Sequence, residues 1–252
     1  MKLTADPRNP AQYFGACGLF ELASARDRSL TSRWDGNALI IEPWSDDDFR
    51  QLANDFAHAE LIPDDTWAGE DMVRPYAITN RDTDLHVSMD WWERRNGRGN
   101  SFWKCFGGQQ KSTDAAKLLT ACPSLSSELS PENLLQLSIP LTGRLGFDPR
   151  SGWNPIDTGF SPNDLGTALK AVPTYVFAEL LSAVALQCWP FQPARGSCLY
   201  QLWEQPLPLS LARVHAVTGR GPAYEFSRIK RGQGISCFTY SRPARASKES
   251  RS

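Results

Sequence analysis

A run of arginines and glycines between aromatic residues carries the most distinctive chemistry of this sequence. Arg94, Arg95 and Arg98 lie among Gly and Asn residues, two Trp residues precede them, and Phe102 and Trp103 follow. Arginine neutralises phosphates, aromatic rings stack on unpaired bases, and glycine permits close approach of the backbone. The pattern predicts a nucleic-acid contact; a solvated hairpin above buried Trp residues is an equally good interpretation.

Further polar and cationic segments extend this prediction. Residues 107–113 form a Gly-rich turn before a helix, where backbone amides bind anions, but the glycine that a nucleotide-hydrolysing phosphate loop needs before its Lys is replaced by Gln110. Residues 144–154 place two Arg beside Gly and Trp; the alternative there is an ion pair between Asp148 and an Arg. The basic cluster at 228–231 suits a polyanion or a solvated strand. The candidate nucleic-acid-binding residues are Arg94, Arg95, Asn96, Arg98, Asn100, Lys104, Gln109, Gln110, Lys111, Arg144, Arg150, Arg228, Lys230 and Arg231.

Carboxylates and a histidine suggest a competing chemistry. Asp82, Asp84 and His86 alternate along a predicted strand, and Asp90 continues the spacing. Three such groups on one face could hold a divalent metal, whereas an edge strand facing water is the commoner outcome. No nucleophile or metalloprotease motif is present, which leaves open only a catalytic site built from distant residues, and we expect no cofactor. A metal-dependent nuclease is the alternative.

The charge of the chain is nearly balanced overall and strongly uneven locally. There are 27 basic and 28 acidic residues, for a net charge of −1. Residues 42–71 contain ten acidic residues and one Arg, whereas 91–111 contain five basic residues and one Glu, and 213–251 contain nine basic residues and two Glu. Overall charge therefore excludes attraction of the whole chain to a polyanion, and any such binding is local.

Composition indicates a folded protein. The chain has 252 residues, of which 41% are hydrophobic, and it includes nine Trp. No apolar run is long enough to span a bilayer. The six Cys form no CxxC pair, which favours reduced thiols and a cytoplasmic location.

The elements that must position these residues follow from periodicity, capping and turn signals. We expect helices at 10–26, near 46–60 after Ser45, near 113–121 and within 164–188, where Pro173 breaks or starts the helix. A strand pair with its turn at 34–37 is expected within 34–42, and strands are expected at 85–92 and 102–106. The segments 199–203, 211–217, 224–229 and 235–240 are expected as strands or short elements. A Ser-rich connector at 123–131 reads as a hinge. The predicted fold is α+β: mixed small sheets with flanking helices, an irregular Gly/Pro-rich central loop at 140–162 and a reduced C-terminal helical part. We divide the chain into an N-terminal α+β region at 1–122, with the acidic helix and the basic aromatic loop, and a second region at 123–252, with the central loop, the apolar helix and the basic C-terminal strands. The alternative is that both regions form one continuous domain.

Several stretches, taken in order, resemble one protein family. They are Asn9-Pro10 with 14–23, Asp90-Trp91-Trp92, 102–104 with Gln109-Gln110, 148–154 with 157–163, 179–181, Trp203 with 206–208, and Arg231-Gly232. Together they are similar to the small Cas8-type protein, at the large-subunit position, of type I-U (I-G) CRISPR Cascade effectors. The scattered match covers roughly residues 9–243, and its order and spacing carry it.

This resemblance implies a non-enzymatic subunit of an RNA-guided surveillance complex in antiviral defence. Such a subunit lies near the 5′ end of the guide RNA, contacts the short motif beside the target (the PAM), helps to open the duplex and docks the helicase–nuclease. The implied partners are guide RNA, target double-stranded DNA, other Cascade subunits and the helicase–nuclease, without a membrane. A purely architectural subunit that grips guide RNA or a sister protein is the other alternative.

Overall fold

The computed structural model describes most of the chain. The described residues are 1–63, 65–66, 75–89, 112–141, 145–150, 171–190, 192–194, 197–231 and 235–244. They form an α+β fold with small sheets, as the sequence predicts. Every strand pairing among the described residues is antiparallel, so the described sheets do not mix parallel and antiparallel strands.

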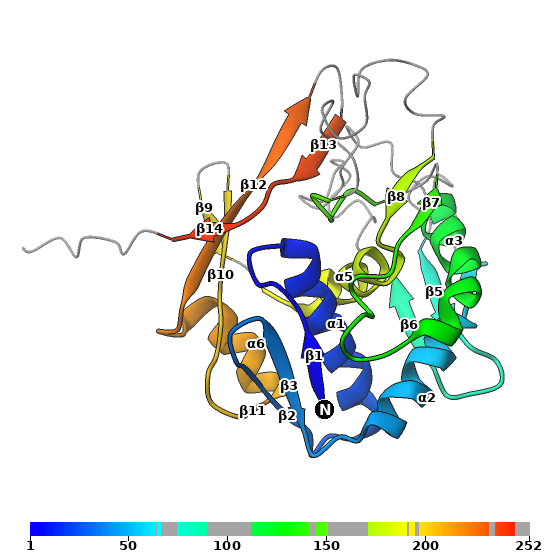
Figure 1. The fold of residues 1–252 in the computed structure, drawn as a ribbon, viewed down its shortest axis with the longest axis horizontal. Coiled ribbons are helices and arrows are strands. Elements are labelled where there is room, and N and C mark those ends of the chain that lie inside the picture. The colour runs from blue at the N-terminus through cyan, green and yellow to red at the C-terminus, as the bar shows by residue number, and fades with distance from the viewer. Residues whose placement is uncertain are drawn as a thin grey trace, which may run out of the picture.

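Two buried helices pass through the centre of the molecule (Figure 1). Helix α1 (Pro10–Arg26) begins where the side chain of Asn9 accepts hydrogen bonds from the next two free amides, and Pro suits the first helical position because its missing N–H would be unpaired there. Fourteen of its 17 residues are buried. Helix α5 (Val176–Cys188) packs along α1 and is buried from 176 to 186. The predicted helix at 10–26 is confirmed.

Glycine allows these two helices to approach closely. A Cβ atom on Gly18 would lie 2.0 Å from the carbonyl oxygen of Leu181, which no neighbouring side-chain motion could relieve. At Gly15 the nearest atom to such a Cβ would be the flexible end of the Leu135 side chain, at 3.0 Å. Gly18 therefore fixes the α1–α5 crossing.

A four-stranded sheet flanks this helix pair and joins distant parts of the sequence. Its order is β1 (Lys2–Thr4), β3 (Ala38–Glu42), β2 (Thr31–Trp34) and β11 (Leu207–Pro208). The β2–β3 turn contains Gly36 at φ +57°, a conformation that favours glycine. The strand pair predicted around this turn is confirmed.

The acidic part of the sequence forms a separate layer beside the central helices. Helix α2 (Asp46–Ala57) starts at a capping box between Ser45 and Asp48. The next three strands pair in the order β4 (Glu60–Pro63), β5 (Tyr76–Thr79) and β6 (His86–Met89), and helix α3 (Ser112–Ala121) packs on β4. The predicted helices near 46–60 and 113–121 are confirmed.

Two expectations about local structure are wrong. The Ser-rich connector forms a 3-10 helix, η4 (Cys122–Glu128), which packs on α2 and buries Leu125. The segment expected as a strand at 211–217 is helix α6 (Leu209–Thr218), because Ala212 and Ala216, one helical turn apart, pack inward.

The remaining strands form two small sheets in the C-terminal half. Strands β7 (Ile139–Leu141) and β8 (Val172–Thr174) pair with each other, so Pro173 lies in a strand before α5 rather than in the helix. The larger sheet has the order β13 (Ile235–Phe238), β12 (Ala223–Arg231), β10 (Ser197–Gln201) and β9 (Gln192–Ala194), and β14 (Arg242–Pro243) also pairs with β12. The predicted strands at 199–203, 224–229 and 235–240 are confirmed, with ends that differ by at most two residues.

One hydrophobic core spans the two predicted regions. The Tyr13 ring of α1 stacks on Tyr200 of β10 with centroids 3.9 Å apart, and it also stacks on the Trp34 ring with centroids 5.4 Å apart. The Trp203 indole donates to the carbonyl of Ser32 at 2.8 Å. Residues on both sides of position 122 therefore belong to the same packed interior.

No helix of the described chain has both the length and the apolar character needed to cross a bilayer.

Candidate nucleic-acid interface

Most of the candidate residues lie outside the described part of the chain. They are Arg94, Arg95, Asn96, Arg98, Asn100, Lys104, Gln109, Gln110, Lys111 and Arg144. The strand predicted at 102–106 and most of the central loop lie outside it too. Arg150, Arg228, Lys230 and Arg231 are the candidates on described backbone.

Strand β12 brings three of these candidates into one regular element. Its register places Arg228 opposite Phe238, Lys230 opposite Ser236 and Arg231 opposite Ile235 of β13. The sequence contains no Asp or Glu between Phe226 and Ser241. The segment from Phe226 to Ser241 therefore contributes no carboxylate that could neutralise these cations, and the nearest acidic residue along β12 is Glu225.

An exposed aromatic residue follows this strand pair. Tyr240 comes two residues after the end of β13, and 54% of its surface is exposed, whereas Phe238 is 1% exposed. Partial burial raises the pKa of the Tyr240 phenol, so its ring remains neutral at physiological pH. An exposed neutral ring can stack on a base. The sequence does not single out Tyr240, because alternation along 235–240 places it on the same face as buried Phe238.

The structure assigns Arg150 to internal contacts. Its Nε and one Nη bind Asp148, at 3.0 and 2.6 Å, and further bonds reach the Gln136 side chain at 2.5 Å and the Leu135 carbonyl at 2.7 Å. Its guanidinium also lies over the Tyr175 ring, 3.5 Å from the centroid. Four of its five N–H donors are therefore used within the chain. The ion pair with Asp148, which the sequence allowed as the alternative, is present.

A buried carboxylate holds the backbone beside Arg150. Glu179 of α5 is fully buried and accepts hydrogen bonds from the amides of Leu145, Phe147 and Asp148, at 3.0–3.2 Å. Asp148 in turn accepts from the Asn9 side chain at 3.0 Å. The loop 145–150 is therefore fixed to the starts of both central helices.

Carboxylates also neutralise part of the basic C-terminal segment. Arg213 of α6 forms a two-point ion pair with Glu21 of α1, and the hydrogen bond to Glu21 raises the pKa of Arg213. Arg242 lies 3.4 Å from Glu225, whose pKa is lowered mainly by a hydrogen bond from Ser197. Arg220 forms no ion pair with any carboxylate of the described residues.

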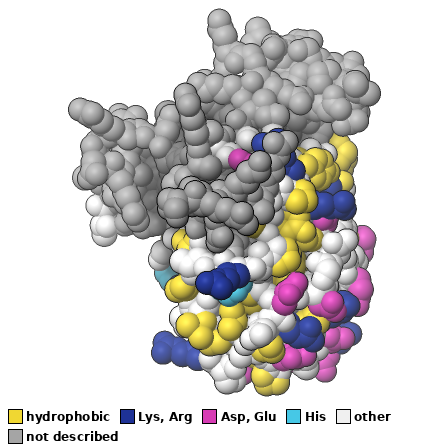
Figure 2. All heavy atoms as spheres, turned by 90° about the vertical axis from the view of Figure 1, so that its left-hand side faces the viewer, with side chains coloured by type: hydrophobic (Ala, Val, Ile, Leu, Met, Phe, Trp, Pro, Cys, Tyr) yellow, Lys and Arg dark blue, Asp and Glu magenta, His cyan; other side chains and the backbone are white. Residues whose placement is uncertain are grey.

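Figure 2 shows no broad region of one charge among the described side chains on this face of the molecule. Acidic and basic side chains lie intermixed along the right side of Figure 2, with hydrophobic side chains between them. In Figure 1, β12 and β13 lie at the end of the molecule opposite α2, which carries three Asp in its first turn. The acidic first turn of α2 and strand β12, with its three cationic residues, thus belong to different ends of the molecule.

The alternative metal site is not formed as predicted. Asp82 and Asp84 lie in the turn before β6, which starts only at His86, so the three side chains do not share a strand face. Asp84 lies 3.6 Å from Arg26, and the His86 ring nitrogen Nδ1 lies 3.1 Å from the Thr79 hydroxyl. Within the described ranges, no three His, Cys, Asp or Glu residues are grouped closely enough to hold a metal ion. Asp90 lies outside those ranges.

No protein-family model, curated protein or solved structure matches this chain.

Proposed function

We propose that this chain is a non-enzymatic subunit of an RNA-guided type I CRISPR surveillance complex, and that strand β12 contacts nucleic-acid phosphates there. The observation that supports the contact is the run from Phe226 to Ser241, which contains three cations, no carboxylate and the exposed ring of Tyr240. The ordered resemblance of the sequence supports the kind of complex.

Within this proposal, cations position the nucleic acid and the guide RNA reads the target. Phosphate contacts fix orientation without carrying sequence information, whereas base pairing with the guide selects the target strand. Contacts with the PAM, duplex opening and recruitment of the helicase–nuclease belong to the same proposal. Since the net charge is −1, binding by the chain alone should be weak, and neighbouring subunits would hold β12 against the polyanion.

The phosphate contact is tested by two matched triple variants. One variant is Arg228→Ala/Lys230→Ala/Arg231→Ala, and the control is Arg50→Ala/Arg81→Ala/Lys117→Ala, which removes three exposed cations paired with carboxylates elsewhere. Affinity for fluorescein-labelled RNA and duplex DNA is measured by anisotropy at several salt concentrations. We expect the first variant to bind at least about tenfold more weakly at low salt. The slope of log affinity against log salt concentration should become shallower by about 0.9 for each duplex phosphate contact that is removed. Equal losses in both variants would exclude β12 as the contact.

The identity of the complex is tested separately. The tagged full chain is purified from its native host, and the RNA that copurifies is sequenced. The proposal predicts short RNAs that share a repeat-derived 5′ end. Recovery of the tagged chain with its protein partners but without such RNA would contradict the assignment to a surveillance complex, whatever the outcome for β12.

A further inference from the structure

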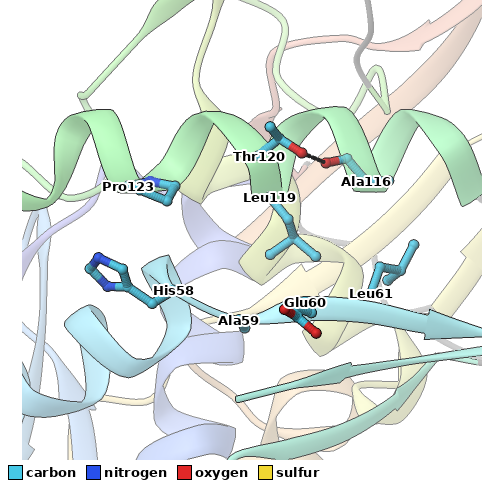
Figure 3. A pocket seen from close by; sticks show the side chains of 8 residues that line it. All are labelled: His58, Ala59, Glu60, Leu61, Ala116, Leu119, Thr120 and Pro123. Carbon is cyan, nitrogen blue, oxygen red and sulfur yellow. Dashed lines mark hydrogen bonds between the residues drawn. The ribbon is translucent and has the colours of Figure 1, made fainter. Parts of the chain in front are cut away.

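A groove lies between helix α3 and strand β4. Its walls come from the end of α2 and β4 on one side and from α3 and the start of η4 on the other, and it encloses about 450 Å³ (Figure 3). It is lined by His58, Ala59, Glu60, Leu61, Ala116, Leu119, Thr120 and Pro123. Its volume lies in the range of ligand-binding clefts.

Strand β4 is an edge strand in the described sheet. It pairs with β5 and with no other described strand. Alternate residues of an edge strand direct their N–H and C=O groups away from the neighbouring strand, where they remain free to pair with another chain. Pro63, which lacks an N–H, ends β4, and proline in a sheet is confined to edges and strand ends.

The groove has apolar walls beside this edge. In Figure 3, Leu61 of β4 points toward α3 and Leu119 of α3 points toward β4, so the two side chains face each other across the space. Leu119 is 3% exposed, whereas Leu61 is half-buried. An extended chain lying on β4 would place its apolar side chains against these residues, which is the geometry of peptide binding by strand addition.

The carboxylate that lines the groove favours a cationic partner. This carboxylate is Glu60, whose side chain is 64% exposed. Arg81 lies 3.4 Å from Glu60, and both side chains are largely exposed, so this pair contributes little and can exchange for another cation. The same charge disfavours a nucleic acid.

We propose that the α3–β4 groove binds an extended, lysine- or arginine-flanked segment of a partner protein, which adds a strand to β4. The alternating side chains of that segment contact Leu61 and Leu119, and its flanking cations pair with Glu60. This binding is independent of the proposed contact between β12 and nucleic acid, because the two lie on different elements.

The test uses the full chain and three fluorescein-labelled peptides. The first peptide alternates Val and Thr over six residues with two Lys at each end; the second replaces Lys by Glu, and the third replaces its two central residues by Pro. We expect saturable binding of the first, measured by anisotropy, and at least tenfold weaker binding of the other two. Absence of saturable binding by the first peptide, or equal binding of the proline peptide, would overturn the proposal.

Two tryptophan variants locate the site. Thr120 is exposed and lines the groove, so Thr120→Trp fills it, whereas Lys117→Trp on the same helix is exposed and does not line it. We expect the first variant to lower peptide affinity at least tenfold and the second to leave it within twofold, with equal melting temperatures for both. Displacement of the peptide by an RNA of similar length, or equal affinity of the two variants, would overturn the assignment.

Discussion

The interior and the periphery of this molecule use charged side chains in different ways. In the interior, Glu179, Asp148 and Arg150 are almost completely engaged with backbone amides and with each other. At the periphery, the three Asp of the first turn of α2 and Glu60 of β4 remain exposed, and the sequence from Phe226 to Ser241, which carries the cations of β12, contains no carboxylate. Cation-rich sequence therefore does not by itself indicate a binding surface, because Arg150 and Arg213 are used to hold the fold.

This difference predicts where substitutions act. Interior changes should reduce the free energy of unfolding by several kcal/mol, since a buried charge without its partner is strongly unfavourable. Peripheral changes should leave stability almost intact and act on binding or on pH dependence.

The largest expected effect is that of Arg150→Ala. The substitution leaves Asp148, which is fully buried, without its cation, and it also removes the contact with the Tyr175 ring. We expect the free energy of unfolding to fall by about 3–5 kcal/mol in urea denaturation. The matched control is Arg220→Ala, at an exposed arginine without an ion-pair partner among the described residues, for which we expect a change within about 0.5 kcal/mol. Similar losses for both arginines would remove the distinction between the two regions.

A smaller effect is expected where the central helices cross. In Gly18→Ala, the new methyl group meets the carbonyl of Leu181 at 2.0 Å, so α1 and α5 must separate. We expect a loss of about 3 kcal/mol from overpacking. Gly15→Ala is the control on the same helix, because the flexible Leu135 side chain can move and alanine favours the helix; its change should stay within about 1 kcal/mol. Thermal and urea denaturation measure both, and a tolerated Gly18→Ala would show that the crossing can adjust.

The elements predicted correctly are those whose signals are local. Asn9 and Pro10 mark the start of α1, Ser45 with three following Asp marks α2, and Gly36 marks the β2–β3 turn. In each case the hydrogen bonds or backbone angles involve residues within three positions, so the sequence contains the whole signal.

The errors concern features that depend on distant contacts. Leu211 to Val217 reads as an apolar strand, but it is helical because its alanines pack inward while Leu211 and Val214 remain more than half exposed. Arg150 finds its partners at Gln136 and Leu135, about fifteen residues away, and no short motif announces them. The exposure of Tyr240 likewise follows from where β13 ends.

The smallest predicted effect concerns the acidic periphery and its response to pH. The hydroxyl and amide of Ser45 donate to Asp48, and these hydrogen bonds hold the pKa of that carboxyl below its ordinary value of 3.8. A carboxyl whose pKa is lowered in the folded state stabilises the protein above its unfolded pKa, and this contribution is lost as pH falls through the folded pKa. The wild-type chain should therefore lose this contribution only below about pH 3.8.

Ser45→Ala tests this pH dependence. We expect the substitution to cost about 1 kcal/mol at pH 7 through loss of the helix cap, measured by urea denaturation. The substitution removes the Ser45 hydroxyl, whose hydrogen bond is the main cause of the lowered pKa of Asp48. The free-energy cost of Ser45→Ala should therefore shrink when the pH falls below 3.8. In an Asp48→Asn background, Ser45→Ala should produce no additional pH dependence in the acid range. A cost that stays constant from pH 7 to the acid range would mean that the Ser45–Asp48 interaction does not depend on the charge of Asp48. The periphery would then resemble the interior, because both would rely on hydrogen bonds rather than on exposed charge.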